Sequence, residues 1–357
     1  MTQMVFDGHN DVLTHLSQNG GRAAAGGFLT GLAGQLDAMR AQIGGFGGGF
    51  FATWAQSDLS LEALEAATRA ETYDLPLPPA VPQAEAWTLI DAQADILWAL
   101  DELGAVKVCQ SLSEVRQAET AGQIAAIFQM EGAEAIGPDL SQLDQLYARG
   151  LRSLGLAWSR PTIFGDGVPF RFPSDGDIGS GLTEAGRSLV VRCNELGILI
   201  DLSHLNAAGV ADVAEISDAP LVATHSNAHA ICPHARNLTD AQLSLIAKSG
   251  GLVGLNFECT FLHPHGRPDP DTPAEVALQH LDHLIDRLGE EGVALGSDFD
   301  GCRPPNWIDS ADKLPALVQA MEGHGYKAAR IERICWENWM RILGETWREA
   351  PEDHAKG

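Results

Sequence analysis

Residues 181–204, GLTEAGRSLVVRCNELGILIDLSH, hold one complete helix-and-strand unit of the chain. A threonine and a glutamate near the start, amphipathic spacing and Gly197 at the end predict a helix over Leu182–Leu196. The apolar run Ile198–Leu202 follows directly and predicts a strand that is buried on both faces. The polar residue His204 comes just after this strand.

The same alternation of helix and strand recurs along the chain. Seven further apolar runs predict strands, namely Met4–Gly8, Gly49–Trp54, Ala125–Met130, Ser153–Ala157, Leu221–Thr224, Leu252–Phe257 and Val293–Gly296. Amphipathic stretches such as Thr239–Ser249 lie between most of the strands. Eight buried strands that alternate with helices favour a closed parallel barrel, so the expected fold class is α/β, a (β/α)8 TIM-type barrel.

No feature of the sequence requires a second domain, and we expect residues 1–357 to form a single barrel domain. Residues beyond Pro304 carry helical spacing. This spacing predicts C-terminal helices packed on the outside of the barrel, where Trp336, Trp339 and Trp347 would provide apolar contacts.

Two segments, one rich in glycine and one rich in proline, differ in composition from the expected strands and helices around them. Gly20–Gly49 contains helical spacing over Leu32–Ile43 and leads into a strand, so we expect it to be ordered. The proline-rich segment Leu75–Gln83 joins two expected helices, Leu61–Thr72 and Ala84–Leu103, and is the best candidate for an exposed loop.

Composition and charge argue against several classes of partner. The formal net charge of −25 disfavours binding to nucleic acid or to anionic membranes. No apolar run reaches about 18 residues, so we expect no transmembrane helix. The first residues, MTQMVFDGHND, lack the basic and apolar regions of a signal peptide, and the six cysteines form no CxxC pair. We therefore expect a cytoplasmic protein with reduced thiols and no membrane partner.

Histidines and acidic residues cluster where the expected strands end. Six of them follow five different strands, namely His9, Asp11, Glu131, His204, His225 and Asp298. In a (β/α)8 barrel the C-terminal ends of the strands converge on one rim, where active sites lie. We therefore expect these residues to meet in space although they are far apart in the chain.

This set of residues suits divalent metal ions. Neutral imidazole and carboxylate groups are good ligands for zinc and similar ions. The set exceeds the needs of one tetrahedral ion, and two ions about 3.5–4 Å apart that share a carboxylate would use the surplus. None of the five lysines stands at a strand end beside the other ligands, so Glu131 is the expected bridge rather than a modified lysine.

Each residue taken alone also fits a structural role. A single histidine after a strand, such as His225, is more often a hydrogen-bonded structural residue, and Asp298 would suit a helix cap. Six such residues at five strand ends are hard to explain by packing, so the joint pattern favours a metal site. His229 and His234, also near the rim, are candidates for contacts that orient the ligands.

At these residues the chain resembles the membrane (renal) dipeptidase family of metallopeptidases. The resemblance covers nearly the whole chain and is carried, in the family's order, by DGHND, FQMEGAEAIG, LGLAWSRPTIFGDG, ILIDLSH, PLVATHSNAHAICPHARNLTD, GGLVGLNF and ALGSDFDG. The secretion and lipid-anchor signals of the mammalian members are missing, so the soluble bacterial branch looks closest.

The resemblance implies a role for each metal ligand. His9 and Asp11 match the His-x-Asp that binds one zinc ion in the family, and Glu131 matches the glutamate that bridges both ions. His204 and His225 match the two histidines that bind the second zinc. The expected cofactors are therefore two Zn²⁺ ions per chain, with other divalent ions left open.

The resemblance also implies residues that act on the substrate. Asp298 matches the aspartate that handles protons, and Arg236 matches the arginine that holds the substrate's C-terminal carboxylate; the other interpretation of Arg236 is an ion pair with Asp240. Mammalian members carry a substrate-binding histidine where this chain has Trp158, whose indole donates a hydrogen bond but cannot accept one. Phe261 replaces a carboxylate-binding tyrosine of the mammalian members.

The expected function is that of a zinc-dependent dipeptidase, on a barrel of the metal-dependent hydrolase kind. A metal-bridging hydroxide would attack the amide bond of a free dipeptide, L,L or also L,D, and Asp298 would pass the proton to the leaving amine. Two alternatives stay open: another barrel amidohydrolase, such as an N-acyl amino acid deacylase or a lactonase, and a non-catalytic metal-binding protein. Preferred side chains, native metal and the presence of a homodimer stay open as well.

Overall fold

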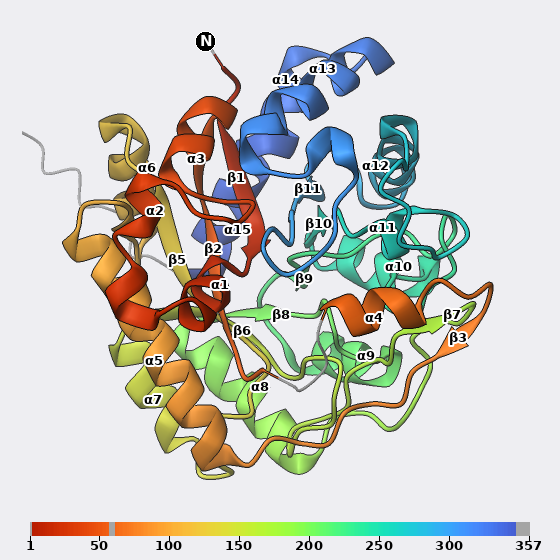
Figure 1. Cartoon of the computed structure of the whole chain (residues 1–357). Helices are drawn as coiled ribbons and strands as arrows, with labels where there is room; N and C mark the ends of the chain where they lie inside the picture. The colour runs from red at the N-terminus through yellow and green to blue at the C-terminus, as the bar shows by residue number, and fades with distance from the viewer. Residues whose placement is uncertain (1, 57–60, 348–357) are drawn as a thin grey trace, which may run out of the picture.

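A computed structural model describes residues 2–56 and 61–347, and these form a closed barrel of parallel strands (Figure 1). In spatial order the ring runs β2, β1, β11, β10, β9, β8, β6 and β5, and β5 pairs again with β2 to close it. The strands of the ring are β1 (Val5–Asn10), β2 (Phe46–Trp54), β5 (Ala125–Glu131), β6 (Leu151–Gly155), β8 (Leu199–Asp201), β9 (Val222–Ala223), β10 (Leu252–Leu255) and β11 (Val293–Leu295).

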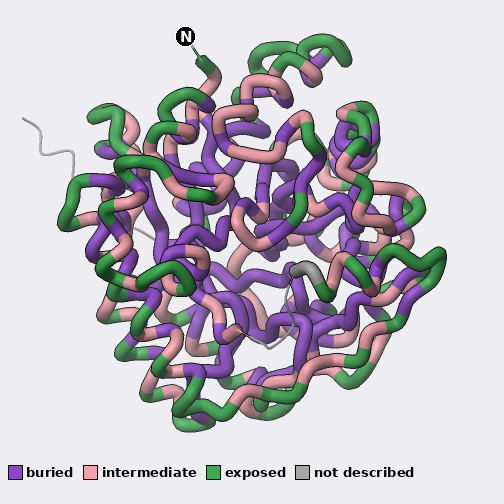
Figure 2. Tube along the Cα trace, in the orientation of Figure 1, coloured by how far each residue is buried: buried purple, intermediate pink, exposed green. Residues whose placement is uncertain are grey.

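Each strand of the ring overlaps one of the eight expected strands, which confirms the predicted (β/α)8 barrel. The remaining strands are short: β4 (Lys107–Val108) adds to one edge of β5, while β3 (Tyr73–Asp74) and β7 (Arg171–Phe172) form a separate antiparallel pair. Figure 2 shows buried residues concentrated in the barrel and exposed residues along the surrounding helices.

The helices surround the ring. In chain order they are α1 (Val12–Gln18), α2 (Gly27–Thr30), α3 (Ala38–Gly44), α4 (Leu61–Ala67), α5 (Gln83–Glu102), α6 (Leu112–Ala121), α7 (Ser141–Ala148), α8 (Glu184–Leu196), α9 (Ala207–Ile216), α10 (Asp240–Lys248), α11 (Cys259–Leu262), α12 (Ala274–Leu288), α13 (Leu314–His324), α14 (Ala328–Glu332) and α15 (Asn338–Trp347). Three short 3₁₀ turns, at Gly21–Ala24, Asn306–Ile308 and Ala311–Lys313, and a π-helical turn at Arg333–Glu337 complete the described elements. None of the described helices is long and apolar enough to cross a membrane.

Local signals explain where α8 begins and ends. The Thr183 side chain accepts a hydrogen bond from the backbone N–H of Gly186, which caps the first turn. Gly197 ends the helix in the left-handed conformation with φ of 68°. The helix therefore ends just before β8 begins, as the sequence predicts.

The glycine-rich segment is ordered, and within the helical spacing of Leu32–Ile43 the helix begins only at Ala38. Only α3 is helical there, because the Asp37 side chain accepts hydrogen bonds from the backbone N–H groups of Arg40 and Leu32. The first bond caps α3, and the second holds the preceding loop against the cap. The proline-rich loop agrees with the prediction, since no helix or strand is present between β3 and α5.

The C-terminal segment closes the end of the barrel at which the strands begin. The expected position of its tryptophans on the outside of the barrel was therefore wrong. Trp336, Trp339 and Trp347 form one apolar cluster with residues from seven strands of the ring: Phe6, Phe50, Ile127, Leu199, Val222, Leu252 and Ala294. Side chains from so many strands can meet only in the barrel interior. The Trp339 indole N–H also donates to the backbone oxygen of Leu295 at 3.0 Å. This apolar layer seals one end of the barrel and leaves the other end for polar residues.

Candidate metal centre and active site

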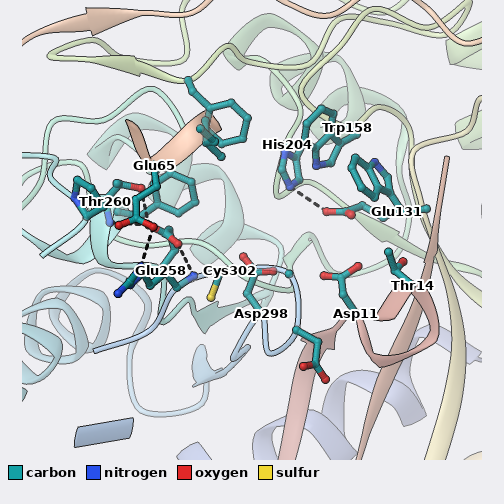
Figure 3. Close-up of a pocket in the computed structure, with 18 of the residues that line it drawn as sticks. Asp11, Thr14, Glu65, Glu131, Trp158, His204, Glu258, Thr260, Asp298 and Cys302 are labelled. Atoms are coloured by element: carbon teal, nitrogen blue, oxygen red, sulfur yellow. Dashed lines mark hydrogen bonds and ion pairs between the residues drawn. The ribbon is translucent and has the colours of Figure 1, made fainter. Parts of the chain in front are cut away.

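The polar end of the barrel opens into a cavity of about 810 Å³. Four of the residues expected at the strand ends line it directly: Asp11, Glu131, His204 and Asp298. Figure 3 shows Glu131 and His204 facing one another, with Asp11 and Asp298 nearby. The helix α4 contributes further lining residues and lies beside the mouth of the barrel (Figure 1).

Glu131 lies at the centre of the three histidines. Its Oε1 atom is 3.8 Å from His9 Nε2, 2.9 Å from His204 Nε2 and 3.5 Å from His225 Nε2. His9 Nε2 also lies 3.2 Å from Asp11 Oδ2. All five side chains are at least nine-tenths buried. The structure thus brings together the whole expected ligand set. Glu131 lies between the pair His9 and Asp11 and the two other histidines, as a bridging carboxylate would.

These donors fit divalent metal ions. Two sets each bring three ligand atoms within 4.8 Å of one another: His9, Glu131 and His225, and His9, Asp11 and Asp298. Burial lowers the pKa of His204 and His225 well below the ordinary value, which favours the neutral imidazole that binds metals.

Without a cation, this cluster confines several acidic groups in a small buried volume. Burial raises the pKa of Glu131 well above its usual range, and the nearby carboxylate of Asp11 adds to the effect, although His9 opposes it. Burial alone would lower the pKa of His9, but the carboxylates of Glu131 and Asp11 raise it well above its usual range. A bound divalent cation would stabilise the ionised carboxylates, so the electrostatics favour a metal site.

Asp298 belongs to this site and does not cap a helix. No described helix begins directly after it, and its backbone has a left-handed φ of 62°, which is uncommon for a residue other than glycine. The backbone N–H of Asp298 donates to the oxygen of His9 at 2.9 Å, and its Oδ2 accepts a hydrogen bond from Asn256 at 2.9 Å. Burial raises the pKa of Asp298 to about 7. A carboxyl group with such a pKa suits proton transfer near neutral pH.

Gly301 allows Asp11 and Asp298 to approach one another. A Cβ atom at this position would overlap Asp11 Oδ2 and would lie 2.6 Å from Asp298 Oδ1. Only glycine leaves both carboxylates in place, which gives a physical reason for the last residue of the segment ALGSDFDG.

Arg236 lies behind the cavity wall, beside the histidines. Its guanidinium group donates to the backbone oxygens of Ser203 and, at 3.3 Å, of His225, and stands 5.2 Å above the ring of Phe261. The side chain is 2% exposed, and its Nε atom has no partner among the described residues. Burial lowers the pKa of Arg236 to about 10, so it stays cationic at neutral pH.

The alternative ion pair between Arg236 and Asp240 does not form. Asp240 instead pairs with His283 at 2.7 Å and with Arg287 at 3.0 Å. The charge of Arg236 is therefore not neutralised by Asp240, and it interacts electrostatically with the buried carboxylates of Asp298 and Glu131.

Trp158 forms part of an aromatic wall. Its ring packs 5.7 Å from His204, 4.9 Å from Trp54 and 5.8 Å from Phe170, measured between ring centroids. The guanidinium group of the buried Arg160 lies 4.9 Å from the centroid of the Trp158 ring. Trp158 thus lines the cavity beside a histidine of the candidate metal centre.

Of the two further histidines near the rim, His234 packs beside Arg236 and against the ring of Phe261, with the ring centroids 4.7 Å apart. It is buried, and its Nδ1 accepts a hydrogen bond from the backbone N–H of Arg236 at 3.0 Å. His229 instead contacts the backbone oxygen of Ser174 at 3.1 Å.

The residues that hold the imidazoles were not predicted from the sequence. Ser159 lies 2.9 Å from His204 Nδ1, Gln129 lies 3.1 Å from His9 Nδ1, and Thr224 lies 2.8 Å from His225 Nδ1. Two of these, Gln129 and Thr224, stand inside expected strands that are otherwise apolar. A polar residue within a strand that is buried on both faces was the signal that could have found them.

A family model of the membrane dipeptidases, peptidase family M19, matches residues 1–356. The chain belongs to this family. As a member of family M19 it is a metal-dependent dipeptidase, which confirms the activity and the family predicted from the sequence.

Two solved structures agree with this assignment, and the chain is also similar to a curated relative whose function is not described. A metallopeptidase from Rhodobacter sphaeroides, liganded with a phosphinate mimic of the dipeptide L-Ala-D-Ala, is 50% identical, with a TM-score of 0.94 over 97% of this chain and 100% of that chain. A second dipeptidase of family M19 is 49% identical, with a TM-score of 0.94 over 98% of this chain and 100% of that chain. An uncharacterized protein from the pqqA 5′ region of Klebsiella pneumoniae is 40% identical over 71% of this chain and 97% of its own length.

Proposed function

We propose that this family M19 protein hydrolyses free dipeptides of both L,L and L,D configuration with two zinc or similar divalent ions at the strand ends. The observation that carries the proposal is the buried position of the Glu131 carboxylate between the Nε2 atoms of three histidines. The Rhodobacter sphaeroides structure holds a mimic of an L,D dipeptide, which supports this substrate class. A cytoplasmic location remains a prediction, and a homodimer remains an open alternative.

Each candidate residue has a role in this proposal. The ions would be held by His9, Asp11, Glu131, His204 and His225. Bound ions would supply polarisation of the peptide carbonyl and a water molecule of lowered pKa. Because Asn256 holds Oδ2 of Asp298, Oδ1 is the atom that would accept a proton from water and pass it to the leaving amine.

The remaining residues would bind and enclose the substrate. The Arg236 guanidinium would hold the C-terminal carboxylate, and the Trp158 indole N–H would donate to the carbonyl oxygen of the scissile bond. Trp54, Phe170 and Phe261 line the same cavity and would exclude water from it.

The substrate class is tested by comparing small amides on the zinc-loaded enzyme. We expect turnover of L,L and L,D dipeptides and poor turnover of N-acyl amino acids, because the latter lack the free amino group of a dipeptide. Release of amino acids is measured for matched pairs such as L-Ala-D-Ala and N-acetyl-D-Ala. Faster turnover of the N-acyl compounds would favour a deacylase over a dipeptidase.

The metal content gives a second prediction. We expect carefully loaded protein to hold two divalent ions per chain by elemental analysis, because the ligand set exceeds one tetrahedral site. The Glu131→Gln variant should lose affinity at both positions, since this side chain faces all three histidines. Full activity at saturation with a single ion would contradict the two-ion proposal.

A further inference from the structure

The structure assigns a positioning role to Asp201, at the end of β8. We propose that this one carboxylate sets the protonated nitrogen of both His9 and His225, so that each imidazole presents a free Nε2 to the metal centre. The proposal rests on the metal site proposed above, because one of these histidines belongs to each of the two proposed ions.

Asp201 is buried in the barrel interior and is surrounded by donors. Its Oδ1 accepts hydrogen bonds from the backbone N–H groups of Ser203 at 3.0 Å and Thr224 at 2.9 Å, and from the Ser203 hydroxyl at 2.6 Å. Its Oδ2 accepts from Gln129 Nε2 at 3.1 Å and from the Thr224 hydroxyl at 2.6 Å. Two of the five donors are backbone groups, which cannot reverse their polarity.

The first link runs from Asp201 to His9. A side-chain amide between a carboxylate and an imidazole must turn its NH₂ group to the carboxylate, so Gln129 turns its oxygen to the imidazole. Gln129 Oε1 lies 3.1 Å from His9 Nδ1, which must therefore carry the proton. In the neutral ring, the form that would bind metal, the lone pair of His9 then sits on Nε2, the atom on the side of Asp11 and Glu131.

The second link runs from Asp201 to His225. The single proton of the Thr224 hydroxyl is given to Asp201 Oδ2, so the hydroxyl oxygen must accept from another neighbour. The Ser203 hydroxyl, 3.3 Å away, gives its own proton to Asp201 Oδ1, so the donor is His225 Nδ1 at 2.8 Å, which must carry a proton. His225 then also has its lone pair on Nε2, which faces Glu131 at 3.5 Å.

His204 offers an internal comparison. Its Nδ1 contacts the Ser159 hydroxyl at 2.9 Å, and no hydrogen bond joins Ser159 to Asp201 among the described residues. A change at Asp201 should therefore alter the protonated nitrogen of His9 and His225 and spare that of His204.

The variant Asp201→Asn is expected to reverse the donor and acceptor roles along both links. The two backbone N–H groups require the amide oxygen at the Oδ1 position, so the new NH₂ group must occupy the Oδ2 position. Gln129 would then turn its NH₂ to His9, and Thr224 would donate its proton to His225. Both imidazoles would carry their protons on Nε2, the atom that should bind metal.

The first measurement is ¹⁵N–¹H correlation NMR of the histidine rings in the metal-free protein. Unsubstituted protein is expected to carry a proton on Nδ1 of both His9 and His225, while His9 Nε2 can also hold a proton against Asp11 in the absence of metal. Asp201→Asn is expected to lose the Nδ1 proton of both rings and to keep only Nε2–H, with His204 unchanged. Unaltered protonation of His9 and His225 in folded Asp201→Asn would overturn the proposal. This result does not depend on metal binding, so it separates the inference from the proposed function.

The second measurement is zinc affinity by competition with a chelator. Asp201→Asn is expected to lower the affinity of both positions by about 10- to 100-fold, the range found when groups that orient metal ligands are removed. Asp37→Asn serves as the control, because Asp37 is equally buried but caps α3. Affinity unchanged from the unsubstituted protein would contradict the role assigned to Asp201.

Two further variants separate the links. Asp201→Asn combined with Gln129→Glu provides a carboxylate that accepts both from the new amide and from His9, so the Nδ1–H form should return at His9 but not at His225. Thr224→Val removes only the link to His225, and it tests the proposal if Asp201→Asn fails to fold. Loss of the Nδ1–H form at His9 in Thr224→Val, or its failure to return in the double variant, would refute separate links.

Discussion

Asp298→Asn is expected to keep the metal ions and to lower kcat by about 100-fold or more, the usual scale for removing a general acid–base group. Asparagine keeps the shape of the side chain and tolerates the left-handed backbone of this position. It can still bond to Asn256, yet it cannot accept and release a proton. Turnover and elemental analysis of the same preparation measure both quantities.

Asp300→Asn is the matched control for this experiment. Asp300 lies two residues further on, also has a left-handed φ, of 66°, and its Oδ1 accepts from the backbone N–H of Gln35 at 2.6 Å. Its replacement should disturb the loop in a similar way without removing the proposed proton carrier. If Asp298→Asn retained near-normal turnover, or if both variants lost it equally, Asp298 would have only a structural role.

The fold could be predicted because each strand is buried on both faces and therefore appears as an apolar run. Parallel strands also require helices between them, so the alternation of the two patterns indicates the barrel. The position of Trp336 and Trp339 could not be predicted in this way. Their helical spacing marks an apolar face but does not say whether that face covers the outside of the barrel or closes its end.

The candidate site was predictable for a different reason. Polar residues directly after apolar strands stand out, and the barrel brings strand ends together, so His9, Glu131 and His225 could be placed at one rim. Asp201 and Gln129 were missed because they lie inside the expected strands, among apolar residues, and not directly after a strand end. Their function depends on which groups they contact across the barrel, and that information exists only in three dimensions.

Arg236→Met is expected to raise KM strongly for free dipeptides, by roughly tenfold or more if a charged hydrogen bond of about 1.5–3 kcal/mol is lost. A guanidinium group can bind a carboxylate through two parallel hydrogen bonds, and Arg236 is already held beside the histidines by the backbone oxygens of Ser203 and His225. Arg236→Lys should recover only part of the loss, because an ammonium group cannot form this paired arrangement.

The buried position of Arg236 makes an internal control necessary. Removing the guanidinium leaves the oxygens of Ser203 and His225 without this donor, which costs about 1–3 kcal/mol and can disturb the site for any substrate. The decisive quantity is therefore the ratio of kcat/KM for a dipeptide to that for its C-terminal amide, which lacks the charge but has the same shape. Carboxylate recognition predicts that this ratio falls towards one in Arg236→Met. The unsubstituted enzyme prefers the acid, and the variant lacks the guanidinium group that would bind its carboxylate. A ratio that stays constant while both rates fall would mean that Arg236 only supports the histidines, and it would favour an amidohydrolase of broader specificity.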